Sequence, residues 1–190
     1  MHAGPEAPVS PRAYAALAGF EAGAIGVIAM LFCLGLASVW YRHTVWTVAN
    51  IMASNFYGDE AIGPGFAAST LSGLAVYFIL YSLFGALFGA VIRGSGFSRL
   101  RLVAGGLLAG AAWYYLWFGL LWRHFNPIVP LYTHDRPMLW GHLLYGAMLG
   151  RFPLYYRRLT AVPPAPTPLP APLEQPVAEP VAEDTLHPPE

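Results

Sequence analysis

The chain contains no lysine and a single cysteine, and only 11% of its 190 residues are charged. Soluble domains carry about 25% charged residues. One cysteine cannot form a disulfide within the chain, and we interpret Cys33, which lies in an apolar run, as a small buried hydrophobic residue. With 56% hydrophobic residues and a mean hydropathy of +0.49, the chain is predicted to be an integral membrane protein.

Sequence motifs for the common catalytic chemistries are also missing. The chain has no phosphate-binding loop, no dinucleotide-binding glycine run, no serine-hydrolase elbow and no haem-attachment motif. All ten basic residues are arginines, and nine of them lie between Arg42 and Arg158, at the boundaries of apolar runs. This distribution argues against a nucleic-acid surface, and we predict no cofactor, no catalytic residue and no nucleic-acid partner.

Four long apolar runs with few charges predict transmembrane helices near residues 20–41, 66–92, 102–122 and 137–156. The first three are long enough, at 1.5 Å per residue, to cross a hydrocarbon core of about 30 Å. The fourth has 14 residues between Arg136 and Arg151, so it spans only if Arg151 reaches the interface and the helix continues past Pro153. The expected fold is an all-α membrane protein, with a bundle of about four transmembrane helices over residues 18–158.

Residues 43–57 differ from these runs because polar side chains recur along one helical stripe, at His43, Thr47, Asn50 and Ser54. This pattern predicts an amphipathic helix that lies in the membrane interface or re-enters it. The flanks differ again: residues 1–17 are predicted to be a mobile segment, and residues 159–190 a disordered, proline-rich acidic tail.

The tail is defined by its composition, since residues 162–190 hold ten prolines and five acids and no aromatic residue. Such a segment cannot bury enough apolar surface to offset the entropy of ordering it. We interpret it as a solvated arm that binds a partner, or as an extension without a function.

The arginines predict the orientation, because cytoplasmic flanks are enriched in positive charge. With four spans, seven arginines lie on the side of the two termini and three on the other. Both termini are therefore expected in the cytoplasm. If residues 43–57 crossed the membrane, the termini would lie on opposite sides.

Each predicted span contains two glycines four residues apart, which allow helix backbones to approach closely in a bilayer. The pattern predicts a tightly packed bundle, with one groove left for a second copy; a general abundance of glycine (20 of 190) is the alternative explanation. The eight glycines are Gly19, Gly23, Gly85, Gly89, Gly106, Gly110, Gly146 and Gly150.

Ionisable groups inside a membrane are costly, so they are the first candidates for function. His142 lies within the fourth predicted span, and its roles range from proton relay, metal or haem ligand to a structural hydrogen bond. Glu21, at the inner end of the first span, is a candidate coupling carboxylate or a solvated acid near a helix start. Asn50 and Asn126 are further polar candidates.

Four histidines are predicted on the outer side of the bundle, together with three carboxylates. Histidine and carboxylate ligands suit zinc or copper, although no local ligand spacing is present. The weak candidates for a metal or haem site are His43, His124, His134 and His142.

Several short motifs occur in a fixed order, and they include Asn50, Phe125-Asn126-Pro127 and the stretch from His142 to Gly146. In this order the chain resembles small four-helix bacterial inner-membrane proteins that have no assigned activity, over residues 20–152. The resemblance implies a bacterial cytoplasmic membrane, and it draws attention to Pro127 besides the polar candidates above.

Three functions remain open from the sequence. The leading interpretation is a non-enzymatic bundle that stands alone or is an accessory subunit of a larger membrane complex. The second is a small homodimeric transporter or channel, for which the central thirds of the spans offer few polar residues beyond Ser72, Tyr77, Tyr81 and Ser82. The third is a redox subunit that binds metal or haem through the outer histidines.

Overall fold

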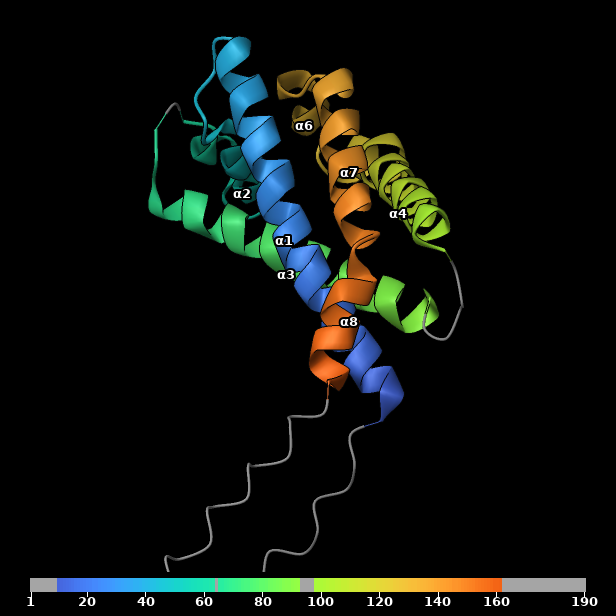
Figure 1. The fold of residues 1–190 in the computed structure, drawn as a ribbon. Coiled ribbons are helices and arrows are strands. Elements are labelled where there is room, and N and C mark those ends of the chain that lie inside the picture. Colours follow the sequence, from blue (N-terminus) through green and yellow to red (C-terminus); the bar gives the residue numbers. More distant parts are fainter. Residues whose placement is uncertain (1–9, 64, 93–97, 162–190) are drawn as a thin grey trace, which may run out of the picture.

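A computed structural model describes residues 10–63, 65–92 and 98–161, and helices are the only regular elements in these ranges (Figure 1). The elements in chain order are α1 (Pro11–Trp40), α2 (Thr47–Tyr57), the 3-10 helix η1 (Gly58–Ala61), α3 (Ala68–Ile92), α4 (Arg99–Tyr114), the π-helix η2 (Tyr115–Leu121), α5 (Trp122–Phe125), α6 (Ile128–Tyr132), α7 (Asp135–Leu149) and α8 (Phe152–Thr160).

Three helices of the described chain are long and apolar enough to cross a membrane. They are α1 with 30 residues, α3 with 25 residues, and the continuous 27-residue rod Arg99–Phe125 that α4, η2 and α5 form together. The prediction of an all-helical chain with apolar helices of membrane length is confirmed for these residues.

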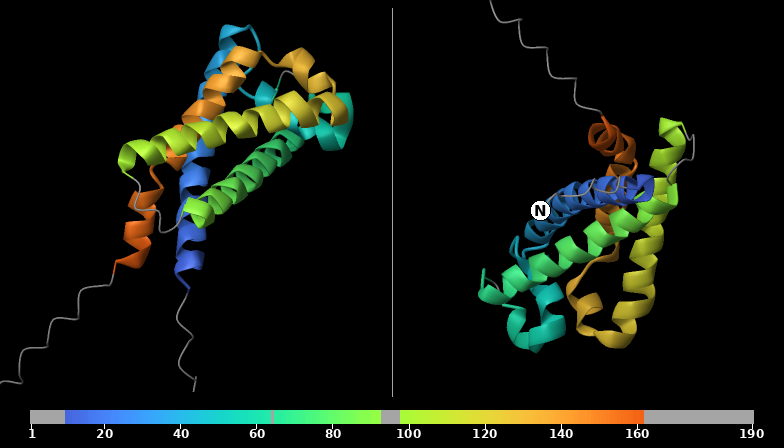
Figure 2. Two further views of the ribbon diagram at one scale, coloured as in Figure 1. Left: turned by 90° about the vertical axis from the view of Figure 1, so that its right-hand side faces the viewer. Right: turned by 90° about the horizontal axis from the view of Figure 1, so that it is seen from below.

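The helices α1 and α7 lie side by side, and their facing sides form the centre of the core (Figure 1). Figure 2 shows α3 running at a steep angle to α1, and α4 in turn packs on α7. The largest fully buried side chains lie mainly between α1 and α7 and include Met30, Leu34, Tyr145 and Leu149. The short helices α2 and α6 lie at the end of the bundle where α1 terminates.

Helix α1 begins earlier than the sequence indicated, because residues 11–17, expected in a mobile segment, are helical. Ser10 caps the helix by accepting a hydrogen bond from the Ala13 amide, and Pro11 occupies the first turn, where its missing N–H costs nothing. Ala15 and Ala18 then pack against Phe152 of α8. This contact with a distant helix gives the first turns a partner that periodicity does not reveal.

The region predicted as one helix over 137–156 is divided in two. Helix α7 ends at Leu149, Gly150 and Arg151 form a turn, and α8 begins at Phe152 with Pro153 in its first turn. Proline lacks the N–H that a continuing helix would need, so it starts a new helix here rather than sitting inside one. Residues 159 and 160, expected in the tail, belong to α8; residues 162–190 lie outside the described chain.

Glycines bring the backbones of α1 and α3 into direct contact. A Cβ atom added at Gly23 would lie 2.7 Å from the carbonyl oxygen of Tyr81, and one at Gly85 would lie 2.8 Å from the Cα of Gly23. Gly19 faces the carbonyl of Gly85, and Gly89 faces that of Ala15. Any side chain at these positions would therefore separate the two helices.

The same arrangement recurs where α4 crosses α7. Gly106 and Gly146 each face the carbonyl group of the other, and Gly110 faces the carbonyl of His142. A Cβ at Gly150 would lie 2.7 Å from the Cα of Val103. All eight glycines singled out in the sequence thus lie at one of two helix crossings.

We predict that Gly106→Ala destabilises the protein and that the neighbouring substitution Gly105→Ala does not. A Cβ at Gly106 meets the backbone of α7, and overpacking of this kind costs about 1–3 kcal/mol. The nearest atom to a Cβ at Gly105 is 3.9 Å away, so alanine there adds only its higher helix propensity, up to about 1 kcal/mol. Thermal unfolding of the two detergent-solubilised variants measures the difference, and equal melting temperatures would contradict the glycine contact.

Candidate functional site

His142 of α7 is 1% exposed, and both of its ring nitrogens are engaged. Nδ1 lies 2.7 Å from the carbonyl oxygen of Met138, which can only accept, so Nδ1 carries the proton. Nε2 lies 2.7 Å from the hydroxyl of Tyr81 and therefore accepts a hydrogen bond from it. In this neutral form His142 makes one structural hydrogen bond on each side of the ring.

A second tyrosine closes this group of side chains. The hydroxyl of Tyr145 donates to the carbonyl oxygen of Tyr81 at 2.6 Å, and Tyr145 is fully buried. The rings of Tyr114 and Phe118 stand edge-on to His142, with centroids 5.4 and 5.6 Å away. We call Tyr81, His142 and Tyr145 the Tyr–His cluster; it joins α3 to α7 inside an aromatic surround.

Asn50 holds α2 to the chain that follows it. Its Nδ2 donates to the carbonyl oxygens of Gly63 and Gly65 at 2.9 and 3.0 Å, and its Oδ1 accepts from Thr70 at 2.6 Å. Asn50 is 1% exposed, so each of these bonds replaces water that the group has lost. Its amide therefore fixes the path between α2 and α3.

Asn126 makes the equivalent link on the other side of α2. Its Nδ2 donates to Ser54 Oγ at 3.2 Å and to Asn55 Oδ1 at 3.1 Å, while its Oδ1 accepts from the amide of Ile128. The turn between α5 and α6 is thereby tied to α2. Both asparagines act as structural anchors in this arrangement.

Within α2, the polar stripe predicted over residues 43–57 is buried against other parts of the protein. Every residue from Val48 to Ser54 is buried, so neither face of this part of the helix is open to solvent. Gly73 of α3 also faces the carbonyl oxygen of Ala49 directly. The period of the stripe was visible in the sequence. It did not show that Asn50 bonds to carbonyl groups and a hydroxyl outside the helix, or that Ser54 accepts a bond from a distant side-chain amide.

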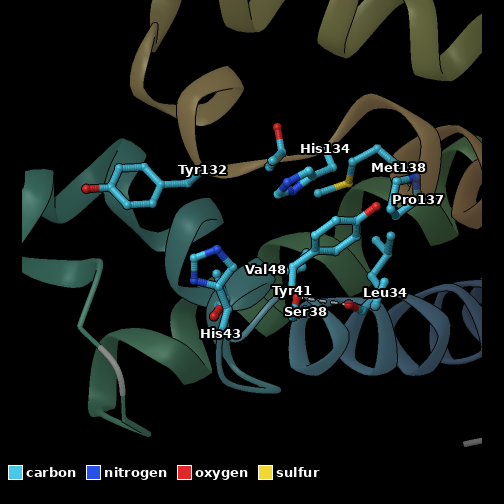
Figure 3. A pocket seen from close by; sticks show the side chains of 12 residues that line it. Leu34, Ser38, Tyr41, His43, Val48, Tyr132, His134, Pro137 and Met138 are labelled. Carbon is cyan, nitrogen blue, oxygen red and sulfur yellow. Dashed lines mark hydrogen bonds between the residues drawn. The ribbon is translucent and has the colours of Figure 1, made fainter.

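A small cavity opens at the end of the bundle where α1 terminates (Figure 3). Its volume is about 20 Å³, which is room for about one water molecule. The His134 ring stacks on Tyr41 with centroids 3.8 Å apart, and His43 stands apart from this pair in Figure 3. A neighbouring cavity of about 210 Å³ shares His43 and Thr47 and reaches Asn50.

The candidate metal ligands do not converge. Among the residues that the structure describes, no group of three or more histidine, cysteine or acidic side chains is placed to hold a metal ion. His124 bonds through Nδ1 to the Leu120 carbonyl oxygen, and His134 stacks on Tyr41. His142 is buried with both nitrogens in use, so these histidines do not form a shared ligand set.

Glu21 has a partner that the sequence did not indicate. Its carboxylate lies 3.5 Å from the guanidinium of Arg158 in α8. The Arg158 side chain is 79% exposed, and exposed ion pairs contribute about 0–1 kcal/mol. The pair marks where α8 returns to α1.

Comparison with known proteins identifies no relative of this chain. No protein-family model, curated protein or solved structure shows a significant match to this chain. The functional argument therefore rests on the geometry of the residues.

Sequence reasoning identified His142 but not its partners. Tyr81 was visible only as one of a few polar residues in the middle of its span, and Tyr145 lies one turn after His142 in an apolar stretch. Their pairing across 61 and 64 positions of the chain has no local signal.

We predict that Tyr81→Phe lowers the stability of the folded protein by about 1–3 kcal/mol, because it leaves the buried Nε2 of His142 without a donor. Tyr115→Phe is the matched control, since Tyr115 is 62% exposed and its hydroxyl bonds to no described residue. Thermal unfolding of both variants in the same detergent checks this. A destabilisation shared by the two variants would contradict a specific role for the Tyr81 hydroxyl.

Proposed function

We propose that this chain is a four-span, non-enzymatic helical bundle that serves as an accessory subunit of a larger complex in a bacterial cytoplasmic membrane. The observation that carries the proposal is the closed state of the Tyr–His cluster. Its ring nitrogens and the hydroxyl groups of Tyr81 and Tyr145 all bond to protein atoms. No ring nitrogen or hydroxyl of the cluster is left over for a substrate, which a proton relay or a ligand site would need. The buried Nε1 atoms of Trp113 and Trp117 beside it have no hydrogen-bond partner in the described part of the chain.

The fourth span is α7, which has 15 residues and a length of about 22 Å. It is shorter than a hydrocarbon core of about 30 Å, but its position supports the assignment. α7 packs against both α1 and α4, and α8 continues beside the first turns of α1. The start of α1 and the end of α8 leave the same end of the bundle, as an even number of spans requires (Figure 1).

The arginines support an orientation with both termini in the cytoplasm. Seven of the ten lie on the side of the termini when the chain crosses four times. The bacterial membrane follows from the resemblance to small inner-membrane proteins.

Two features of the chain support the proposed role as a subunit of a larger complex. The side of α1 that faces away from the bundle exposes large apolar side chains, among them Phe32 at 69% and Leu36 at 58%, which contact lipid or a neighbouring helix. The acidic, proline-rich sequence beyond residue 161 has the composition of an arm that binds a partner surface.

The first experiment is a gentle extraction of the full chain from its native membrane, followed by native mass analysis with absorbance and metal readout. We expect an assembly heavier than a homodimer of the 20.6 kDa chain, with a second protein in fixed ratio. A monomer or homodimer alone would contradict the accessory role.

A flux measurement separates this proposal from the transporter hypothesis. Purified protein in liposomes should carry no proton flux, and His142→Gln should change only stability, because His142 serves a structural bond. Flux that the wild type carries and the folded His142→Gln variant loses would overturn the proposal.

A further inference from the structure

A cavity of about 320 Å³ lies between the rod Arg99–Phe125 and the start of α7. This volume is within the range of small-molecule pockets, about 300–1,000 Å³. Its lining combines charged and aromatic side chains: Tyr114, Tyr115, Phe118, Gly119, Arg123, Asp135, Arg136 and Leu139. The polar candidates His142, Asn50 and Asn126 do not line it, but Tyr114 and Phe118 belong both to its lining and to the rings around the Tyr–His cluster.

The charged groups of this cavity are not paired with one another. Arg123 and Arg136 carry two positive charges and Asp135 carries one negative charge, and all three side chains are exposed. Within the described chain the one ion pair joins Arg158 to Glu21, so no guanidinium here lies within 4.0 Å of the Asp135 carboxylate. Two guanidinium groups that can donate hydrogen bonds and one carboxylate that can accept them therefore line the same cavity.

The wall of the cavity is an irregular stretch of helix. Gly119 lies within the π-helix η2, and the nearest atoms to a Cβ added there belong to Tyr115, at 3.8 Å. A π-turn widens the helix and often accompanies a functional site. The missing side chain at Gly119 leaves open space next to Tyr115 in the wall of the cavity.

The cavity lies at the level where lipid headgroups begin, if the rod Arg99–Phe125 spans as proposed above. Arg123 precedes the end of this rod by two residues, and Asp135 and Arg136 open α7. Leu139 and Phe118 extend the lining toward the apolar part of the bundle. A ligand with a charged head and an apolar tail matches this order.

We propose that this cavity binds the zwitterionic headgroup of a phospholipid, with its phosphate at Arg123 and Arg136 and its ammonium group at Asp135. Guanidinium groups form strong, charge-assisted hydrogen bonds to phosphate oxygens, and a carboxylate accepts bonds from an ammonium group. A headgroup that carries only negative charge would leave Asp135 opposed to it, so the carboxylate selects for the zwitterion. The acyl chains then run along Phe118 and Leu139.

The test measures lipid binding by native mass spectrometry of the full chain in detergent, with phosphatidylethanolamine, phosphatidylglycerol or inorganic phosphate added. We expect the double variant Arg123→Gln/Arg136→Gln to bind phosphatidylethanolamine at least roughly tenfold more weakly, since it removes both charge-assisted contacts to the phosphate. Asp135→Asn should weaken phosphatidylethanolamine binding and strengthen phosphatidylglycerol binding, because it removes the negative charge.

Two further variants serve as a steric test and as a control. Gly119→Leu fills the cavity without changing charge and should also displace the lipid, while Arg99→Gln/Arg101→Gln removes the same charge at the far end of the rod and should not. Unchanged lipid binding in Arg123→Gln/Arg136→Gln or in Gly119→Leu would overturn the site. Competition by inorganic phosphate at concentrations equal to the lipid, or an unaltered lipid preference in Asp135→Asn, would overturn the zwitterionic headgroup as the ligand. The outcomes of these lipid-binding tests do not depend on the accessory role, which is tested separately by co-extraction with a partner.

Discussion

Direct contact between helix backbones at two glycine crossings sets the positions of the long helices. Between apolar helices in a bilayer, lipid is as apolar as leucine, so van der Waals contact at short range has to hold them together. α1 meets α3 through Gly19, Gly23, Gly85 and Gly89, and α4 meets α7 through the other four glycines. Because a single Cβ would strike backbone atoms of the partner helix at these points, the two crossings tolerate little variation.

The buried Tyr–His cluster follows from these crossings. Tyr81 stands one turn before Gly85, and its carbonyl faces Gly23; His142 stands one turn before Gly146, and its carbonyl faces Gly110. The two residues thus hold matching places in two similar crossings, and their side chains meet at 2.7 Å. The likeness between the α1–α3 pair and the α4–α7 pair ends at η2. The π-turn there has no counterpart in α1, and the cavity lined by Arg123 and Asp135 opens beside it.

The long apolar helices were predictable because each contains a long run without formal charge, and the glycine pairs were visible by their spacing. The partners of the buried polar groups were not. Asn50 bonds to carbonyl groups 13 and 15 residues away, and Asn126 bonds to side chains about 70 residues away. Periodicity shows that polar residues share a helix face, but it does not say whether water, lipid headgroups or protein amides cover that face.

Charge distribution and hydrophobic run length alone determined that this chain is helical and apolar enough for a membrane, since both depend only on neighbouring residues. Tertiary structure decided that residues 48–54 of α2 are buried against other helices, that α7 and α8 are separate helices, and that Glu21 pairs with Arg158. It also brought Arg123 of α5 to one cavity with the adjacent Asp135 and Arg136 of α7. These features depend on the angle and depth at which helices cross, which arise from contacts between residues far apart in the chain.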